Sequence, residues 1–438
     1  MTDVPASRPM AVPSSRFNRF ARLGSTAAGI AGTMAVRALG EVGRGTRPDM
    51  RRLLMTPGNM RRLADELARM RGAAMKVGQL ISMDAGDVLP PELADIMARL
   101  RDQAHSMPPK QLKQVLNRNW GSDWLGSFQR FDVHPVAAAS IGQVHRARLK
   151  DGRDIAIKVQ YPGIANSIDS DVANVSRLIR MSGMIPKDFD LAPYMEEARN
   201  QLREETNYAR EGAYLQRFAD LLKDSEAFDV PEFHQDWSTP DILTMTYLEG
   251  EPIESAADAT QEERNRIATA LIELTLREVF EFNVTQSDPN FANFRYDANT
   301  GKIILLDFGA SRDLDVGLVG GYQRLMRAGL EGDMGALRQA AIEMQFVEGD
   351  GAFDDRILAM MQTVFDAVRH TDAFDFSDRS LSDQMNEHAM ALAKAGYVPP
   401  TIPMDVLYLQ RKFGGMFLLG SRLGAVLPVG RLMQRHLQ

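Results

Sequence analysis

The stretch TQSDPNFANFRYDANTGKIILLDFGASR, residues 285–312, decides which fold this sequence predicts. Residues 303–306 are apolar and follow the turn signal Asn-Thr-Gly at 299–301, which predicts a buried strand. This strand leads directly into the turn Asp307-Phe308-Gly309. We therefore expect the Asp307 carboxylate to lie at the mouth of a cleft.

Two polar residues precede this strand with an informative spacing. Asp288 and Asn293 lie in one predicted loop, with four residues between them. Kinase catalytic loops have this spacing, and the Asp-Phe-Gly turn follows them at a similar distance. Asp307 is a hard oxygen ligand for Mg²⁺, and Asn293 is a neutral second ligand. Asp288 can orient or deprotonate an attacking hydroxyl or water, so the ordered set predicts phosphoryl-transfer chemistry.

The composition is that of an ordinary globular protein. The chain has 438 residues, of which 44% are hydrophobic and 25% charged, enough for roughly two or three domains. It has no cysteine, which excludes disulfides, thiol catalysis and the common zinc modules. The histidines show no metal-ligand spacing.

The charge is unevenly distributed along the chain. Residues 1–60 hold nine arginines against three acidic residues, whereas the whole chain has a net charge of −7. A basic arm on an acidic body predicts an anionic partner surface. Because no aromatic-basic interleaving is present, we expect a membrane and no nucleic acid.

Residues 1–48 predict a flexible basic tail with an apolar segment. Residues 1–20 are rich in Pro, Ser and Arg, as in a disordered tail or a transit peptide. Residues 23–36 are uncharged and would span roughly 21 Å as a helix, less than the ~30 Å hydrocarbon core. A helix in the membrane interface fits better than a membrane span, and packing on the protein's own body is the alternative.

Residues 49–126 predict a helical extension that carries the motif Lys76-Val-Gly-Gln79. Lys76 and Gln79 are three positions apart and share a helix face. From spacing alone, Lys76 is typical of a helix lysine whose charged end reaches solvent.

Residues 127–160 change to the period of strands, with a hairpin signal at Asp151-Gly152. The preceding loop matches the kinase glycine loop, with Gly142 on the third glycine and Val144 on the valine that follows. Alanines replace the first two glycines. The residues of this loop that would approach a nucleotide are Ala137, Ala138, Ala139, Ser140, Gly142 and Val144. Lys158 then matches the phosphate-binding lysine, although a structural salt bridge is the alternative.

Residues 194–218 predict one long charged helix. One of its glutamates should pair with Lys158, and the pattern alone does not choose among Glu204, Glu205 and Glu211. Residues 242–248 predict the strand at the position of a kinase hinge, and a mainly helical region follows. The Ala-Pro-Glu segment that positions a peptide substrate in protein kinases is missing after Asp307.

Together these motifs resemble the UbiB/ADCK atypical kinase-like family over roughly residues 60–430. The form QSDPNFANF is similar to that of its mitochondrial coenzyme Q branch. The resemblance implies an α+β, two-lobe fold with an added N-terminal helical subdomain. The expected regions are the tail 1–48, the extension 49–126, an N-lobe at 127–247 and a C-lobe at 248–438.

The resemblance also implies ATP or ADP with Mg²⁺, and a role in ubiquinone biosynthesis at a membrane. Lys158 would contact the phosphates and pair with Glu211, and Asp288 would be the catalytic acid. Asn293 and Asp307 would hold Mg²⁺. The remaining implied contacts are Met245 and Tyr247 for the nucleotide. The regulatory set is Lys76, Gln79 and Glu205. Lys76 and Gln79 would lie on a helix that closes the cleft to protein substrates, and Lys76 is expected to pair with Glu205 of the 194–218 helix.

One residue departs from the family pattern. The second acid of its Glu-x-Asp motif is Asn207 here, so any role that needs this charge is in doubt. The expected function is a membrane-associated ATPase, and the alternatives are a phosphotransferase for a small lipid or metabolite and a nucleotide-binding scaffold. The expected location is cytoplasmic and peripheral to a membrane, or the matrix face of the inner mitochondrial membrane. Quinone-pathway lipids or enzymes are expected partners, and a homodimer is left open.

Overall fold

The computed structural model describes residues 58–59, 65, 67, 70–84, 106–182, 190–397 and 403–437. The chain divides into two compact units, residues 1–213 with 232–247 and residues 214–231 with 248–438. Each unit is described by itself. The predicted tail and interface helix at 1–48 lie outside the described residues. Across the described ranges, no helix combines the length and apolar character that a membrane crossing requires.

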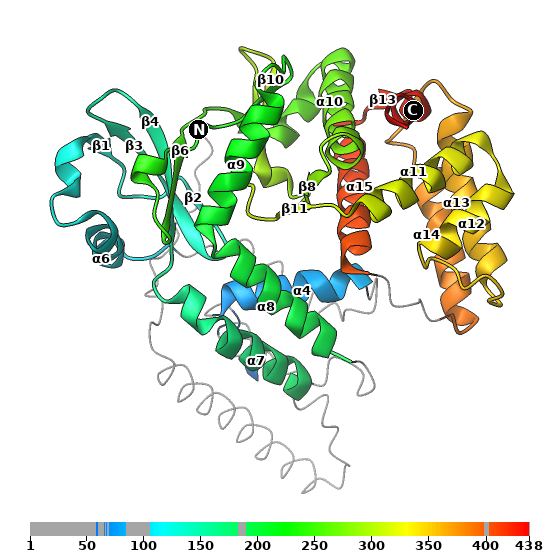
Figure 1. Ribbon diagram of the computed structural model, residues 1–438, viewed down its shortest axis with the longest axis horizontal. Helices are drawn as coiled ribbons and strands as arrows, with labels where there is room; N and C mark the ends of the chain where they lie inside the picture. Colours follow the sequence, from blue (N-terminus) through cyan, green and yellow to red (C-terminus); the bar gives the residue numbers. More distant parts are fainter. Residues whose placement is uncertain are drawn as a thin grey trace, which may run out of the picture. The chain divides into compact units, whose positions relative to one another are not determined.

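Unit 1 is built on a five-stranded sheet with the order β1-β3-β4-β6, in which β2 also pairs with β3 (Figure 1). Its strands are β1 (Phe128–Phe131), β2 (Ala137–Ala138), β3 (Gly142–Leu149), β4 (Asp154–Gln160) and β6 (Ile242–Thr246). The β3–β4 hairpin is the one predicted from Asp151-Gly152, and Gly152 adopts a φ of 99° in its turn. Glycine is favoured at such a positive φ because glycine has no Cβ.

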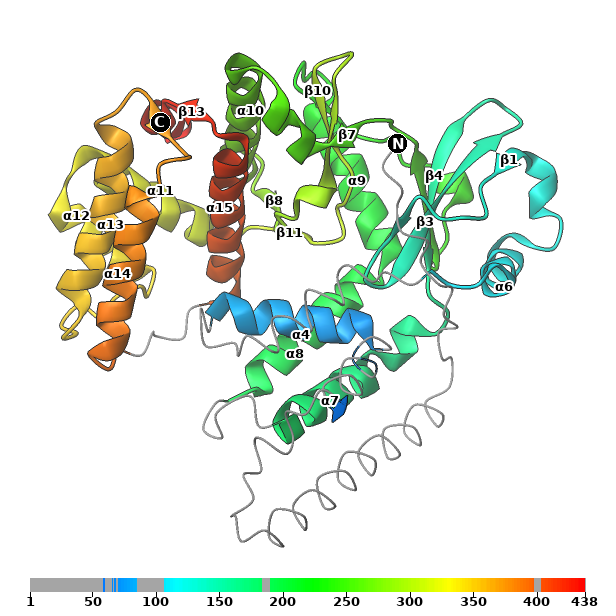
Figure 2. The same cartoon turned by 180° about the vertical axis from the view of Figure 1, so that it is seen from behind.

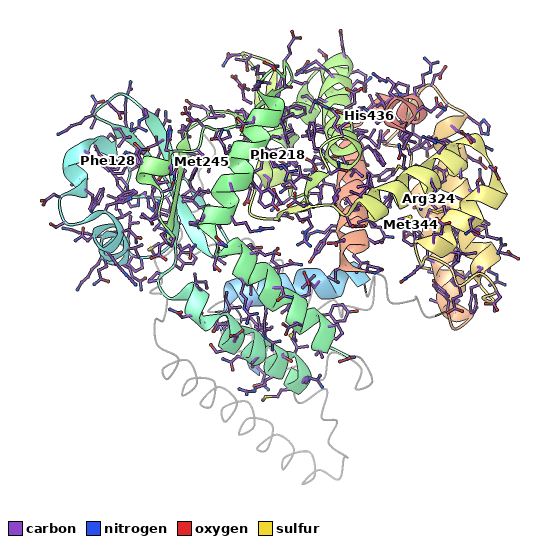
Figure 3. The ribbon with its side chains drawn as sticks, in the orientation of Figure 1. Phe128, Phe218, Met245, Arg324, Met344 and His436 are labelled. Carbon is purple, nitrogen blue, oxygen red and sulfur yellow. The ribbon has the colours of Figure 1, made fainter. Side chains whose placement is uncertain are left out.

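Unit 1 also contains helices. They are α4 (Arg71–Asp84), α6 (Pro109–Trp120), α7 (Ile164–Ser182), α8 (Ala192–Glu205) and the first part of α9 (Tyr208–Leu222), with 3₁₀ turns η2 (Trp124–Ser127) and η3 (Gln235–Trp237). α4 packs along α7 and α8, as both ribbon views show (Figures 1 and 2). An aromatic cluster of Trp120, Trp124, Phe128 and Trp237 covers the sheet near α6, with ring centroids 5.1–5.9 Å apart; Phe128 is labelled in Figure 3.

Unit 2 contains small sheets and many helices. The sheets are β5-β10-β9-β7, β11-β8 and β12-β13. Their strands are β5 (Phe228–Asp229), β7 (Glu251–Pro252), β8 (Val284–Gln286), β9 (Phe294–Asp297), β10 (Lys302–Leu305), β11 (Ser311–Asp313), β12 (Phe374–Asp375) and β13 (Val426–Leu427). β10 is the buried strand predicted ahead of Asp307.

The helices of unit 2 are α10 (Gln261–Phe280), α11 (Val316–Glu331), α12 (Met334–Glu343), α13 (Asp354–Arg369), α14 (Ser380–Lys394), α15 (Met404–Leu423) and α16 (Val429–His436), with η4 (Ile253–Asp258) and η5 (Phe291–Asn293). α10 packs against α15 and α16, and α11 packs against α12 and α13. The α+β class predicted from the sequence is confirmed.

Two predictions about secondary structure were wrong. The helix expected over residues 194–218 is two helices, α8 and α9, separated at Thr206-Asn207. The region after residue 248 was expected to be mainly helical, with strands in the 285–312 segment, yet β12 and β13 also pair in this region. Each of these strands has two residues, too few for an alternating pattern to show in the sequence.

A buried histidine connects the strands of unit 1. The Nδ1 of His145 donates to the Asp132 carbonyl at 2.8 Å, because a carbonyl only accepts. Its Nε2 therefore accepts from the Gln143 amide, also at 2.8 Å, and Gln143 in turn accepts from the backbone N–H of Met107. Burial lowers the pKa of His145 to about 4, so the ring is neutral at pH 7.

We predict that acid destabilises unit 1 through His145. Between pH 6.5 and 4 the unfolded state binds the proton and the folded state does not, so stability is full above this window and falls as the pH decreases through it. From pH 7 to pH 5 the loss from this residue should be about 2 kcal/mol. Urea unfolding of the wild type and of His145→Gln at several pH values measures it. His388→Gln is the control because His388 is exposed. Parallel pH profiles for all three proteins would contradict the prediction.

Candidate functional site

A buried ion pair in unit 1 joins the central strand to a helix. The Lys158 Nζ on β4 donates to the Glu211 carboxylate at 2.7 Å, and both residues are buried. Glu211 lies in the first turn of α9, where the helix dipole stabilises a negative charge. The Lys158 ammonium also lies 5.4 Å from the centre of the Tyr208 ring. The expected pairing of Lys158 with Glu211 is therefore confirmed.

The alanine-rich loop forms a tight hairpin over the end of this strand pair. Ala137 pairs with Val144 and Ala138 with Gln143, and the N–H of Ala139 donates to the Gly142 carbonyl at 2.8 Å. A Cβ at Gly142 would lie 2.5 Å from the carbonyl oxygen of Val159. Only glycine fits there, because that contact is to backbone. Val144 also lies opposite Lys158 in the β3–β4 register, so the loop and the lysine belong to one rigid hairpin.

The regulatory residues predicted in unit 1 also meet. Lys76 on α4 forms an ion pair with Glu205 at the end of α8. Glu205 accepts a second hydrogen bond, from the Ser140 hydroxyl at 3.1 Å. Gly72 lies close to this loop, since a Cβ there would be 3.3 Å from the Ser140 carbonyl oxygen. Glu205 therefore ties α4 to the alanine-rich loop. The side chain of Gln79 lies outside the described residues.

Asn207 explains why the expected long helix is broken. Its side-chain oxygen accepts from the N–H of Arg210 at 3.0 Å, which makes it the N-cap of α9. Asparagine and aspartate cap helices about equally well. The amide thus serves this role without a charge, as expected for a residue that contributes a hydrogen bond only. The cap also separates the helix that carries Glu205 from the one that carries Glu211.

The two hinge-strand residues differ in their surroundings. Met245 is buried and lies opposite Ala156 on β4. The ring of Tyr247 is covered by the Arg146 guanidinium, 4.0 Å from its centre. The nucleotide contacts implied for both residues stay predictions.

In unit 2, Asn293 organises the other predicted residues. Its amide nitrogen donates to the backbone and side-chain oxygens of Asp288, at 3.2 and 3.3 Å. The backbone carbonyl of Asn293 accepts from the N–H of Leu306, the residue directly before Asp307. Asp307 accepts from the N–H of Gly309 at 2.9 Å, which fixes the Asp-Phe-Gly turn. The catalytic-loop residues and the end of β10 are thereby brought together. The carboxylate of Asp307 and the amide oxygen of Asn293 are the donor types that Mg²⁺ prefers.

Helix α15 adds residues that the sequence analysis missed. Arg411 donates to the Asp288 carboxylate at 2.7 Å. The adjacent Lys412 donates to the carbonyl of Gln286 at 2.9 Å. A Cβ at Gly415 would collide with Pro289, so α15 touches the loop closely there too. The sequence signal was the basic pair followed by glycines within an otherwise apolar helix.

Three features define a kinase-like enzyme. They are the strand lysine Lys158 with its helix partner Glu211, the alanine-rich hairpin, and the set of Asp288, Asn293 and Asp307. Residues 99–341 match the model of the ABC1 atypical kinase-like domain. The chain belongs to this family, which the sequence motifs had indicated as UbiB/ADCK. It is an atypical kinase-like ATPase or phosphotransferase.

Similar proteins cover nearly the whole chain. The atypical kinase COQ8, mitochondrial, of Saccharomyces cerevisiae is 36% identical over 97% of this chain and 85% of its own length. The atypical kinase COQ8B, mitochondrial, of Rattus norvegicus is 34% identical over 98% of this chain and 81% of its own. A solved structure, the complex of Rv3197 with erythromycin from Mycobacterium tuberculosis, has a TM-score of 0.62 at 23% identity, and the match covers 96% of this chain and 98% of that one. It shows a shared fold.

We predict that Lys76→Ala alters nucleotide selectivity while the fold is retained. The change removes the cation from Glu205, which then holds the alanine-rich loop through Ser140 alone. We expect the ratio of ADP to ATP affinity to change by at least about threefold, or ~0.7 kcal/mol.

Calorimetric titration of both nucleotides measures this ratio. Lys113→Ala is the matched control, because Lys113 is an exposed helix lysine of the same unit. An unchanged ratio in Lys76→Ala would show that the ion pair has no influence on the loop.

Proposed function

We propose that this protein is an Mg²⁺-dependent, kinase-fold ATPase that supports ubiquinone biosynthesis at a membrane. The observation that carries the ATPase assignment is the Lys158–Glu211 pair, held at 2.7 Å beside the alanine-rich hairpin. A buried lysine costs desolvation energy unless it is paired, and an ammonium held by a carboxylate beside a glycine-loop-like hairpin is the arrangement that kinase folds use to bind phosphate. The resemblance to the coenzyme Q branch and the relatives named COQ8 support the pathway.

Each of these residues would have a separate role in nucleotide binding or hydrolysis. Lys158 would contact the α- and β-phosphates and be oriented by Glu211. The alanine-rich loop from Ala137 to Ser140 would present backbone N–H groups to the phosphates. In unit 2, Asn293 and Asp307 would hold Mg²⁺, which when bound neutralises phosphate charge. Asp288 would orient the attacking water, and Arg411 holds its carboxylate in place.

Hydrolysis of ATP without a protein substrate fits the missing peptide-docking segment after Asp307. We propose that α4, through Lys76 and Gln79, occupies the place of such a substrate and closes the cleft. Phosphoryl transfer to a small lipid or metabolite is the second candidate, because an acid placed as Asp288 is can orient or deprotonate a hydroxyl as well as a water. Labelled ATP incubated with a lipid extract separates them: released phosphate favours the ATPase and a labelled lipid favours the transferase. A nucleotide-binding scaffold would give neither product.

We predict that Asp307→Asn abolishes Mg²⁺-dependent nucleotide binding and phosphate release. A neutral amide cannot offset phosphate charge as a carboxylate does. Titration of ATP with and without Mg²⁺ measures the effect, and we expect at least a tenfold loss, or ~1.4 kcal/mol, in the presence of the metal only. Asp313→Asn is the control, since Asp313 lies on β11 and pairs with Arg217. Retention of Mg-ATP affinity within about twofold, well under that tenfold change, would refute the metal assignment.

The membrane contact is proposed for residues 1–45. Arg16, Arg19 and Arg22 directly precede the apolar segment 23–36. Each basic residue near an anionic surface contributes about 1 kcal/mol. The expected location is cytoplasmic and peripheral to a membrane, with the matrix face of the inner mitochondrial membrane as the alternative; the names of the relatives are mitochondrial.

We predict that deletion of residues 1–45 releases the protein from anionic liposomes. Co-sedimentation with vesicles containing anionic phospholipid, at low and high salt, measures binding. Neutral phosphatidylcholine vesicles are the control for the electrostatic part. Equal sedimentation of the full and shortened chains would place the contact elsewhere.

A further inference from the structure

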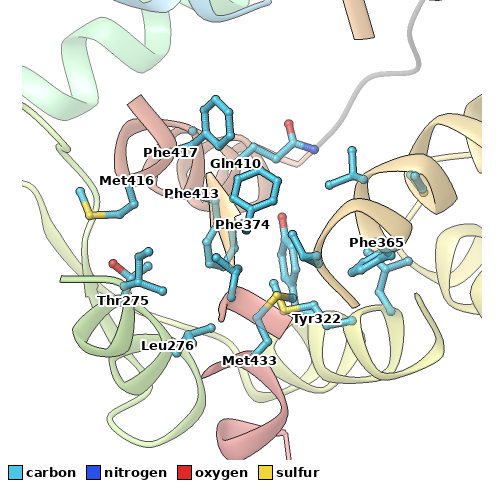
Figure 4. A pocket seen from close by; sticks show the side chains of 18 of the residues that line it. Thr275, Leu276, Tyr322, Phe365, Phe374, Gln410, Phe413, Met416, Phe417 and Met433 are labelled. Atoms are coloured by element: carbon cyan, nitrogen blue, oxygen red, sulfur yellow. The ribbon is translucent and has the colours of Figure 1, made fainter. Parts of the chain in front are cut away.

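Unit 2 contains a large apolar cavity between its helices. The cavity has a volume of about 610 Å³ and is lined by residues of α10, α11, α13, α15, α16 and the strand β12 (Figure 4). Cavities that hold small-molecule ligands in proteins typically measure about 300–1,000 Å³. Native cores rarely leave a void much larger than a water molecule. A space of this size is therefore the scale of a bound ligand.

The residues that line the cavity disfavour a charged ligand. None of the described residues that line the cavity is charged. Two of its polar groups bond to the protein: Thr275 donates to the carbonyl of Leu271 at 2.9 Å, and the Tyr322 hydroxyl donates to that of Val406 at 3.4 Å. Burial raises the pKa of Tyr322, which keeps this hydroxyl neutral. A carboxylate or ammonium inside would lose its hydration without gaining an opposite charge.

Aromatic side chains dominate the lining and favour a ring. The cavity includes six phenylalanines, and its rings already pair with one another: Phe376 and Phe417 have centroids 5.5 Å apart, and Tyr322 and Phe413 5.9 Å apart. These pairs are tilted, and aromatic rings attract one another in such arrangements beyond the effect of the buried area. Four methionines complete the wall, and their flexible side chains adapt to the shape of a ligand.

Helix α15 provides the opening and one polar group. Gln410, Phe413, Gly414 and Phe417 form one stripe of this helix and line the cavity. Gln410 is exposed, and Figure 4 shows its amide at one end of the labelled side chains. Gly414 is exposed as well, and a Cβ there would meet no atom within 4 Å. The absent side chain at this position leaves room at the entrance.

We propose that this cavity binds a neutral, ring-bearing apolar small molecule, whose one hydrogen-bonding end lies at Gln410. The inference goes beyond the proposed ATPase, since it rests on unit 2 alone and requires no nucleotide. A fatty acid, or a segment of the chain itself, is a different occupant that the experiment distinguishes.

The test uses N-phenyl-1-naphthylamine, a neutral aromatic dye that fluoresces in apolar surroundings, with the full-length protein. We expect saturable binding in the wild type. In Gly414→Leu the new side chain enters the cavity mouth, and we expect at least a tenfold weaker affinity. Gly414→Ala should show an intermediate loss, and it keeps the test valid if the leucine variant does not fold. The matched control is Gly320→Leu on α11, where a Cβ would meet only the end of Arg324.

Competition defines the ligand class. We expect decylubiquinone to displace the dye better than 1-decanol, and decanoate to displace it least. Equal displacement by decanol would overturn the preference for a ring, and displacement by decanoate as strong as by decylubiquinone would overturn the requirement for neutrality. Three outcomes would refute the site. In the first the wild type shows no dye binding, in the second Gly414→Leu and Gly414→Ala bind the dye as the wild type does, and in the third Gly320→Leu weakens binding as much as Gly414→Leu. Binding that appears only after deletion of residues 1–45 would identify the chain itself as the occupant and refute a small-molecule site.

Discussion

The ion pair between Glu278 and Lys412 is the interaction on which the catalytic loop of unit 2 depends. Both residues are only 1% exposed, and their charged atoms are 3.0 Å apart. Burial raises the pKa of Glu278, and the Lys412 ammonium opposes that effect. The remaining hydrogen-bonding capacity is taken up by the segment that leads into the loop. Glu278 accepts from the Thr285 hydroxyl and the N–H of Gln286, and Lys412 donates to the Gln286 carbonyl. α10, α15 and β8 are thereby fixed to one another, directly before Asp288.

Lys412 fixes the position of α15 at this point. One side of the helix therefore contacts the loop that carries Asp288, and the other side lines the apolar cavity. Arg411, Lys412 and Gly415 face the catalytic loop. Phe413 and Gly414 face the apolar cavity. The helical period of 3.6 residues places these sets on different sides of one rod. A residue added or removed between 411 and 415 would rotate members of each set away from their partners, so the spacing within this part of the helix is constrained from both sides.

Local patterns predicted the elements that depend on neighbours in sequence. The β3–β4 hairpin followed from Asp151-Gly152, and β10 followed from a short apolar run after a turn signal. The pairing of Lys158 with Glu211 required the family motifs, because the helix offers several glutamates. The contact of Arg411 with Asp288 spans 123 positions, and no local pattern specifies such a contact. The break at Asn207 was missed because strong helix formers on both sides masked an N-cap signal.

Among the described residues, buried cations and exposed cations differ in residue type. The chain has ten lysines, and among those that the structure describes Lys76, Lys158 and Lys412 are buried and paired with a glutamate. Arginine instead forms most of the exposed pairs, such as the one between Arg324 and Glu343. An ammonium is compact and directs three donors around one point, whereas the planar guanidinium needs space for its fork. A buried ion pair often adds little net stability over apolar residues of the same volume, because desolvation offsets the attraction. Each of these three lysines lies beside a loop assigned to the reaction. The burial of these lysines is therefore better explained by the precise placement of those loops than by the stability of the core.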